Sequence, residues 1–329
     1  MKPVGIIANP ASGKDIRRLV AHASVFDNHE KAHILQRVLL ALDAVGVERV
    51  LYMPDYYGLV RRALCDLHLS LDVVEVPMNV WGEERDTTHA ARFLCEHGVA
   101  CLVTLGGDGT NRAVVRGCST VPLIAISTGT NNVFPTMLES TIAGLAAGLI
   151  ARELVDLDTV SYRAKQLEVS VDAELSDLAL IDVVASTDLF IGSRALWEPE
   201  RIREIVLARA EPHNLGMSSI GGLLHPIGPR DPAGMYLRLG EGETRVLAPV
   251  SPGLVIPGPV QSHRLLSLGD VVVLEPAACP IAVDGERQLE VYPHQRVSVR
   301  LTADGPRVVD VEKCLCEAAE HGVLCQPCT

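Results

Sequence analysis

A single carboxylate, Asp108, stands among three glycines in the segment GGDGT at residues 106–110. Glycine lets a backbone approach a phosphate closely, and the first N–H groups of a following helix favour an anion. A carboxylate repels phosphate, so a passive phosphate-binding turn has no use for one. Asp108 fits a turn that also holds Mg²⁺ or that takes a proton from an attacking hydroxyl. The alternative is a local role, as an Asx-turn or as the cap of the helix that follows.

Two other turns have a similar composition, NPASGK at residues 9–14 and STGTNN at residues 127–132. Each follows an apolar run and precedes a polar or helical stretch. Hydroxyl groups in the three turns add donors for phosphate oxygens: Ser12, Thr110, Thr128 and Thr130. One such turn is ordinary strand-to-helix geometry, but three at one edge of a sheet predict a nucleotide-phosphate site. The pattern is neither Walker A nor the dinucleotide G-x-G-x-x-G.

The elements that must position these turns alternate between strand-like and helix-like segments throughout residues 1–155. Strands are expected at 4–9, 49–53, 72–77, 99–105 and 121–127. Helices are expected at 29–46, 56–67, 83–98, 110–118 and 141–155. The alternation predicts a doubly wound, Rossmann-like parallel sheet, in which ligands bind beyond the carboxyl ends of the strands. Residues 1–155 are therefore expected to form an α/β domain that binds nucleotide phosphates.

From about residue 156 the pattern changes to short β-rich segments separated by Gly, Pro, Asp and Ser. This rhythm predicts an antiparallel, β-sandwich-like domain over residues 156–310, which would hold the acceptor. One helix is expected inside it, at 198–210, with Pro199 near its first turn. Residues 311–329 are expected to form a short helix and a cysteine-bearing tail.

Four arginines lie in or just before the expected helix at 198–210: Arg194, Arg201, Arg203 and Arg209. Arginine is usually exposed, so we expect these side chains to be solvated or paired with the neighbouring glutamates. The more specific hypothesis is that one of these arginines reaches across the cleft between the domains and binds a phosphate of the second substrate, the acceptor.

Length and charge limit the classes of function. The 329 residues suffice for two domains, and a formal net charge of −12 argues against broad contact with nucleic acid or an anionic membrane. The first residues lack the apolar region of a signal peptide, and no stretch approaches the roughly 20 apolar residues that span a bilayer. A cytoplasmic protein is expected, with a nucleotide and a small-molecule acceptor as its partners.

The nine cysteines divide into scattered ones and a cluster in the tail. The scattered set is expected to be buried as small hydrophobic residues: Cys65, Cys95, Cys101, Cys118 and Cys279. The tail cluster has one C-x-C and one C-x-x-C pair: Cys314, Cys316, Cys325 and Cys328. Four thiols at these spacings can bind zinc, although zinc ribbons have two C-x-x-C pairs; adventitious disulfides are the alternative.

The three turns together resemble those of the superfamily of NAD kinases, diacylglycerol kinases and sphingosine kinases. GGDGT is the signature of that superfamily, ANPASGK resembles its first-strand motif, and STGTNN resembles its G-T-x-N-D turn. AVDGERQLEV at 282–291 looks like its late Asp-Gly-Glu strand turn. The segments DTTHAA and MSSIGGLLHP, with the chain length, resemble the acetoin-catabolism X type of ATP–NAD kinase-like proteins. The family fold is an α/β domain followed by a β-sandwich.

The resemblance implies phosphoryl transfer from ATP, with Mg²⁺, to a hydroxyl group. Asp108 would be the catalytic base or metal-linked catalyst. The phosphate-binding residues would be Gly106, Gly107, Gly109, Thr110, Asn9, Ser12, Gly13, Gly129, Thr130 and Asn132. Asp182, Asp284 and Glu286 would approach the acceptor from the β domain. The habit of the family also implies a homo-oligomer.

Two departures bear on the acceptor. Val133 replaces the acid of the G-T-x-N-D turn, and Ile181-Asp182 stands where NAD kinases have an Asn-Glu pair that holds the dinucleotide. Asp182 can still accept a hydrogen bond from a hydroxyl. The sequence therefore predicts a kinase for NAD or a related metabolite. A kinase for another hydroxylated metabolite or lipid, and a non-catalytic nucleotide-binding regulator, are the alternatives.

Overall fold

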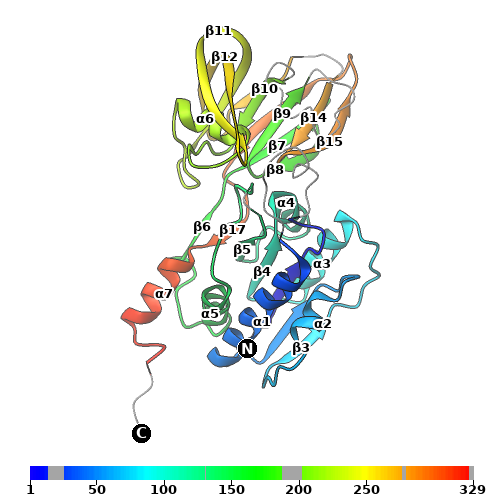
Figure 1. Cartoon of the computed structure of the whole chain (residues 1–329), viewed down its shortest axis with the longest axis vertical. Coiled ribbons are helices and arrows are strands. Elements are labelled where there is room, and N and C mark those ends of the chain that lie inside the picture. The colour runs from blue at the N-terminus through cyan, green and yellow to red at the C-terminus, as the bar shows by residue number, and fades with distance from the viewer. Residues whose placement is uncertain (14–25, 130, 187–201, 276–278, 326–329) are drawn as a thin grey trace.

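The computed structural model describes residues 1–13, 26–129, 131–186, 202–275 and 279–325. Figure 1 shows an α/β part that holds the N-terminus and a β part above it, with connecting segments running between the two. Among the described residues no helix is both long and apolar enough to cross a bilayer.

The α/β part is built on a sheet of seven strands in the order β3-β2-β1-β4-β5-β17-β6. The strands are β1 (Val4–Ala8), β2 (Arg49–Tyr52), β3 (Asp72–Glu75), β4 (Cys101–Gly106), β5 (Leu123–Ser127), β6 (Ser161–Arg163) and β17 (Arg307–Val309). The first five run parallel, and β6 pairs antiparallel with β17. The order of the strands reverses between β1 and β4, which is where doubly wound sheets bind ligands.

Helices cover both faces of this sheet. One apolar cluster joins the sheet to α1 (Asn28–Val45), α2 (Leu59–Ala63), α5 (Ser140–Ala151) and α7 (Val311–Glu320). A second cluster joins the other face to α3 (Glu84–Glu96) and α4 (Asp108–Gly117). The predicted Rossmann-like domain is therefore confirmed.

Helix α1 illustrates how local signals set these elements. The Asp27 carboxylate accepts the N–H of Glu30 at 2.8 Å and caps the first turn, and Gly46 ends the helix with φ of 84°. A Cβ on Gly144 would lie 2.7 Å from the backbone oxygen of Val38, so glycine permits the close contact between α1 and α5.

The β part has two antiparallel sheets packed face to face. The six-stranded sheet is β12 (Leu254–Ser267), β11 (Ala233–Ser251), β10 (Ile202–Leu207), β9 (Asp182–Ser186), β14 (Cys279–Val283) and β15 (Glu286–Val291). The four-stranded sheet is β13 (Val271–Val273), β16 (Val297–Thr302), β7 (Gln166–Val171) and β8 (Glu174–Ala179). One apolar cluster fills the space between the sheets, and α6 (Met217–Leu224) covers the outer face of the larger sheet. The predicted β-sandwich is confirmed.

The expected helix at 198–210 is wrong where the structure describes it. Ile202–Leu207 is strand β10, which pairs antiparallel with both β9 and β11. Ile205, Val206 and Leu207 are all buried, because β10 is a central strand with both faces covered. Residues 217–224, within the MSSIGGLLHP segment, form helix α6.

The chain returns to the α/β part after the sandwich. The expected domain boundaries, 1–155 and 156–310, do not include this return. Strand β17, from the predicted acceptor domain, lies between β5 and β6, and α7, from the predicted tail, packs against α5. The sandwich is thus inserted between β6 and β17, and residues on both sides of it complete the first sheet.

Candidate functional site

The three predicted turns meet at the carboxyl edge of the sheet, on either side of the reversal in strand order. Asn9 follows β1, and its Nδ2 donates to Thr110 Oγ1 at 2.9 Å. Thr128 Oγ1 donates to Ser12 Oγ at 2.9 Å, and the Thr128 N–H donates to the Gly106 carbonyl at 3.3 Å. The NPASGK, GGDGT and STGTNN turns therefore form one hydrogen-bonded structure.

Glycine is required where the turns touch. A Cβ on Gly106 would lie 2.5 Å from the Thr110 side chain, and one on Gly107 would lie 2.8 Å from Asn132 Oδ1. Gly13 has φ of 68°, and a Cβ there would lie 2.5 Å from the Thr128 carbonyl oxygen. These contacts leave no room for side chains, so the backbone itself forms the surface of the site.

The remaining predicted phosphate-binding residues are placed in part. Ser127 Oγ accepts a hydrogen bond from Asn132 Nδ2 at 2.8 Å and donates one to the Gly129 carbonyl at 2.8 Å. Gly109 lies in the first turn of α4. Thr130 and Lys14, the last residue of the NPASGK turn, lie outside the described residues.

Lys31 on α1 forms hydrogen bonds to the backbone of the NPASGK turn. It was not among the site residues predicted from the sequence. Its side chain is fully buried, and its ammonium donates to the carbonyl oxygens of Asn9 (3.1 Å), Pro10 (3.0 Å) and Ser12 (2.6 Å). A signal was present, because Lys31 stands three residues before Ile34 and seven before Val38, on the buried face of α1. A lysine on an apolar stripe needs partners, and the turn provides them.

Asp108 lies at the start of α4 and reaches the backbone that follows the STGTNN turn. Its carboxylate accepts the N–H of Val133 at 3.1 Å and the N–H of Phe134 at 2.7 Å. The helix cap is Gly107, so the capping alternative for Asp108 does not apply. The carboxylate is half-buried and is held at the point where the GGDGT and STGTNN turns meet.

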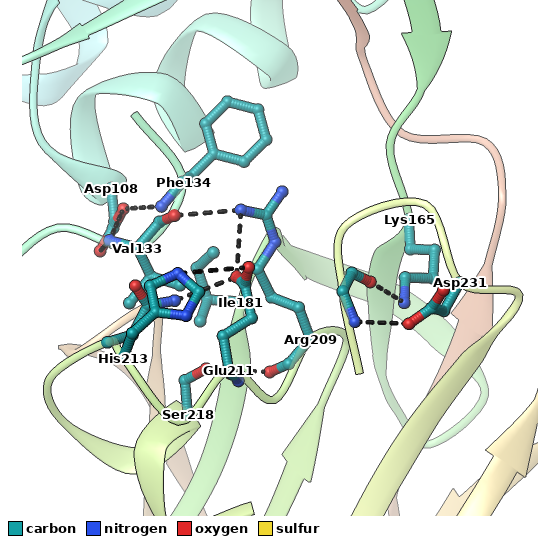
Figure 2. Close-up of polar contacts among 12 residues, drawn as sticks. Asp108, Val133, Phe134, Lys165, Ile181, Arg209, Glu211, His213, Ser218 and Asp231 are labelled. Atoms are coloured by element: carbon teal, nitrogen blue, oxygen red, sulfur yellow. Dashed lines mark hydrogen bonds and ion pairs between the residues drawn. The ribbon is translucent and has the colours of Figure 1, made fainter. Parts of the chain in front are cut away.

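Two arginines, one from each part of the chain, form hydrogen bonds across this junction. Arg209, just after β10, donates from Nη1 to the Val133 carbonyl at 3.0 Å (Figure 2). Arg112 on α4 is fully buried, and its Nη1 donates to the Val283 carbonyl of β14 at 2.6 Å. This hydrogen bond therefore has its donor in the α/β part and its acceptor in the β part. Of the four arginines in or just before the expected helix at 198–210, Arg203 is exposed, and Arg194 and Arg201 lie outside the described residues. Arg209 is therefore the one that the structure places against the turns.

Asp284 lies in the hairpin turn between β14 and β15. Val283 pairs with Glu286, and Asp284 and Gly285 have φ of 50° and 75°, as in the two-residue turns that favour Asp-Gly. The Asp284 carboxylate accepts the N–H groups of Leu180 at 3.0 Å and Ile181 at 2.8 Å.

The resemblance implied that Asp284 and Asp182 contact the acceptor. Both are buried, with 6% and 7% of their surfaces exposed, so in this structure they offer little surface to a ligand. The side chain of Glu286 lies outside the described residues. The structure nevertheless brings Asp108, Asp182 and Asp284 close enough for the charges of the first two to act on the third.

Burial raises the pKa of Asp284 to about 8, and the neighbouring Asp182 carboxylate adds to the rise, against the lowering effect of Arg112. Between about pH 4 and pH 8 the native state keeps a proton that the unfolded state has released. The stability that this group contributes is therefore present at low pH and is lost as the pH rises towards 8.

We expect Asp284→Asn to remove this pH dependence. Urea unfolding midpoints of the two proteins, measured at several values between about pH 4 and pH 8, should diverge in favour of the variant as the pH rises. A difference in midpoint that stays constant across the range would contradict the prediction.

The tail cysteines do not converge on a zinc site within the described residues. Cys314 is fully buried in α7, with its thiol 3.9 Å from the Ala146 carbonyl of α5, whereas Cys316 and Cys325 are exposed. Cys328 lies outside the described residues, among which no group of three or more potential ligands is placed to hold a metal. Cys314 therefore belongs to the core.

Of the scattered set of cysteines, Cys101 and Cys118 are buried as expected. Cys95 is half-buried and Cys65 is exposed, so the expected burial is wrong for Cys65.

Comparison with known proteins identifies the family. Residues 4–154 match the model of the ATP-NAD kinase N-terminal domain, and residues 165–304 match that of the acetoin catabolism protein X C-terminal domain. The chain is 39% identical over 339 residues to acetoin catabolism protein X of Cupriavidus necator, covering 98% of this chain and 93% of that protein. The chain belongs to the acetoin catabolism protein X family. Its residues 4–154 match an ATP-NAD kinase domain, in agreement with the resemblance that the turns indicated.

Two solved structures are similar to this chain. Yeast NADH kinase complexed with NADH superposes with a TM-score of 0.56 at 13% identity, covering all of this chain and 89% of that one. A putative diacylglycerol kinase from Bacillus anthracis str. Sterne gives a TM-score of 0.47 at 13% identity, covering 94% of this chain and 98% of that one. The superposition on yeast NADH kinase shows the NAD kinase-like arrangement of an α/β sheet followed by antiparallel sheets.

Proposed function

We propose that this protein is an ATP-dependent small-molecule kinase that transfers a phosphoryl group to a hydroxyl of NAD or a related metabolite. The observation that supports this is the joining of three glycine-containing turns around Asp108, at the reversal of strand order. Backbone N–H groups and hydroxyls supply neutral donors for phosphate, and Asp108 supplies a carboxylate at the same place.

The residues would divide the work as follows. The NPASGK and STGTNN turns would hold the phosphates of ATP, with Asn9, Ser12 and Thr128 fixed by the bonds described above. Mg²⁺, when bound with ATP, would neutralise charge that develops on the transferred group. Asp108 would orient the acceptor hydroxyl and take its proton. A cytoplasmic homo-oligomer belongs to the same proposal, by analogy with the superfamily.

The second candidate is a nucleotide-binding regulator of acetoin catabolism that performs no transfer. Two observations favour it: Val133 replaces the acid of the superfamily turn, and the carboxylates of Asp182 and Asp284 are buried. In that case the turns would bind nucleotide phosphates, and Asp108 would serve only to hold residues 133 and 134.

Incubation of the purified protein with ATP, Mg²⁺ and one acceptor at a time separates these candidates. The acceptors would be NAD, NADH, a diacylglycerol in detergent and a set of small polyols, with product detected by transfer of labelled γ-phosphate. We expect transfer to one acceptor class. Nucleotide-dependent thermal stabilisation without transfer to any acceptor would favour the regulator, and no nucleotide binding would contradict both.

A further inference from the structure

The peptide group between Val133 and Phe134 has a cation at one end and an anion at the other. Its carbonyl accepts Nη1 of Arg209 at 3.0 Å, and its N–H donates to the Asp108 carboxylate at 2.7 Å. Figure 2 shows how the Arg209 guanidinium, the peptide group and the Asp108 carboxylate follow one another across the junction between the two parts of the chain. Arg209 comes from the β part and Asp108 from the α/β part, so this one peptide group connects them.

This arrangement strengthens both hydrogen bonds. A peptide unit has a dipole of about 3.5 D, with its positive end at the N–H. A guanidinium at the carbonyl polarises the unit further, which makes the Phe134 N–H a better donor to Asp108. The effect depends on a dry environment, and both Arg209 and Phe134 are buried, with 7% and 5% of their surfaces exposed.

Arg209 is itself held in place on several sides. Its guanidinium lies over the Phe134 ring, 5.4 Å from the centroid, and 3.8 Å from a Glu211 carboxylate oxygen. The Ser218 hydroxyl on α6 donates to the Arg209 carbonyl at 3.1 Å and accepts the Glu211 N–H at 3.3 Å. The small-residue helix α6 thus fixes the backbone on which the arginine stands.

We propose that Arg209 is a positioning residue that orients and polarises the hydrogen bond holding Asp108, through the Val133–Phe134 peptide. This inference rests on the proposed function for its effect on turnover, but not for its effect on Asp108 itself. The reactive carboxylate would be correctly held only while the β part is docked on the turns. Arg209 would contribute to the chemical step without touching the substrate.

The amide proton of Phe134 reports directly on this arrangement. The chain has four phenylalanines, so protein labelled with [¹⁵N]phenylalanine gives at most four amide signals, and Phe134→Leu identifies the relevant one. We expect Asp108→Asn to move the Phe134 amide proton upfield, because the charged acceptor is lost. Arg209→Gln should move it in the same direction by a smaller amount, and Arg209→Lys by less than Arg209→Gln.

Arg152→Gln is the matched control. Arg152 also donates to a backbone carbonyl, that of Val45 at 2.7 Å, but it does so at the end of α5, outside the three turns. This variant should leave the Phe134 signal unchanged. If Arg209→Gln fails to fold, as its melting curve would show, Arg209→Lys still provides the test, because it retains a charge and changes only the geometry.

Turnover provides the second readout. Arg209→Gln should lower kcat roughly ten- to a hundred-fold, the scale of a small misplacement of a catalytic group, with little change in KM for ATP. A Phe134 signal that stays in place in Arg209→Gln but moves in Asp108→Asn would overturn the proposal, as would an unchanged kcat. If the wild-type protein has no turnover, the proposed function fails, and the amide signal alone decides whether Arg209 acts on Asp108.

Discussion

Replacing Asp108 with asparagine is expected to abolish phosphoryl transfer while nucleotide binding remains. Asparagine keeps the size of the side chain and can still accept the Phe134 N–H through its oxygen, so the turns should stay together. It cannot take a proton from the acceptor, and loss of a general base lowers the rate by roughly 10²- to 10⁴-fold. Transfer of labelled phosphate measures the rate, and calorimetry measures the affinity for ATP with Mg²⁺.

Asp43→Asn is the control for this variant. The Asp43 carboxylate also accepts two consecutive backbone N–H groups, those of Ser70 and Leu71 at 2.8 and 3.0 Å, at the far end of α1. Both variants therefore lose one charged acceptor of backbone donors, and only Asp108→Asn should lose transfer. Full turnover in Asp108→Asn would show that its carboxylate is structural.

Replacing Lys31 with methionine should destabilise the protein and weaken nucleotide binding together. The methionine fills a similar volume but leaves the carbonyls of Asn9, Pro10 and Ser12 without their buried donor. The Asn9 carbonyl keeps the Ser12 hydroxyl as a donor at 2.7 Å, so we expect a loss of about 1–3 kcal/mol in the free energy of unfolding. The NPASGK turn should relax, and affinity for ATP should fall with it.

Urea unfolding gives the stability, and calorimetry at a temperature where the variant is folded gives the affinity. Lys313→Met, at an exposed position on α7, makes the same chemical change away from the turns and should alter neither quantity. Stability lost without any loss of affinity would mean that Lys31 supports α1 and that the turn keeps its shape alone.

The sequence predicted those features that local chemistry determines. Gly46 marks the end of the helix expected at 29–46, and the glycines of the GGDGT turn identify a close approach of backbone whatever surrounds them. The alternation of strands and helices was enough for the parallel sheet, because crossover connections leave few other arrangements. The order of strands then brings the three turns to one edge.

The errors came from contacts between residues far apart in the chain. Ile202, Ile205 and Val206 suit a helix face or a buried strand equally well, and only pairing with β9 and β11 decides for the strand. Asp284 was recognised in its turn, but its carboxylate binds Leu180, which lies 104 residues away, so the sequence could not show that it is buried. The position of Lys31 on the apolar face of α1 indicated burial, but its partners could not be predicted, because they are backbone carbonyls.

The position of β17 between β5 and β6 has a consequence for biosynthesis. β17 is formed by residues 307–309, so it is synthesised only after all the strands of the sandwich. Until then β6 has no neighbour through which to join the sheet, and α5 lacks the cover of α7. The inserted sandwich, by contrast, is fully synthesised beforehand. We therefore expect the sandwich to fold on the nascent chain first, and the seven-stranded sheet, although it starts with β1, to close last.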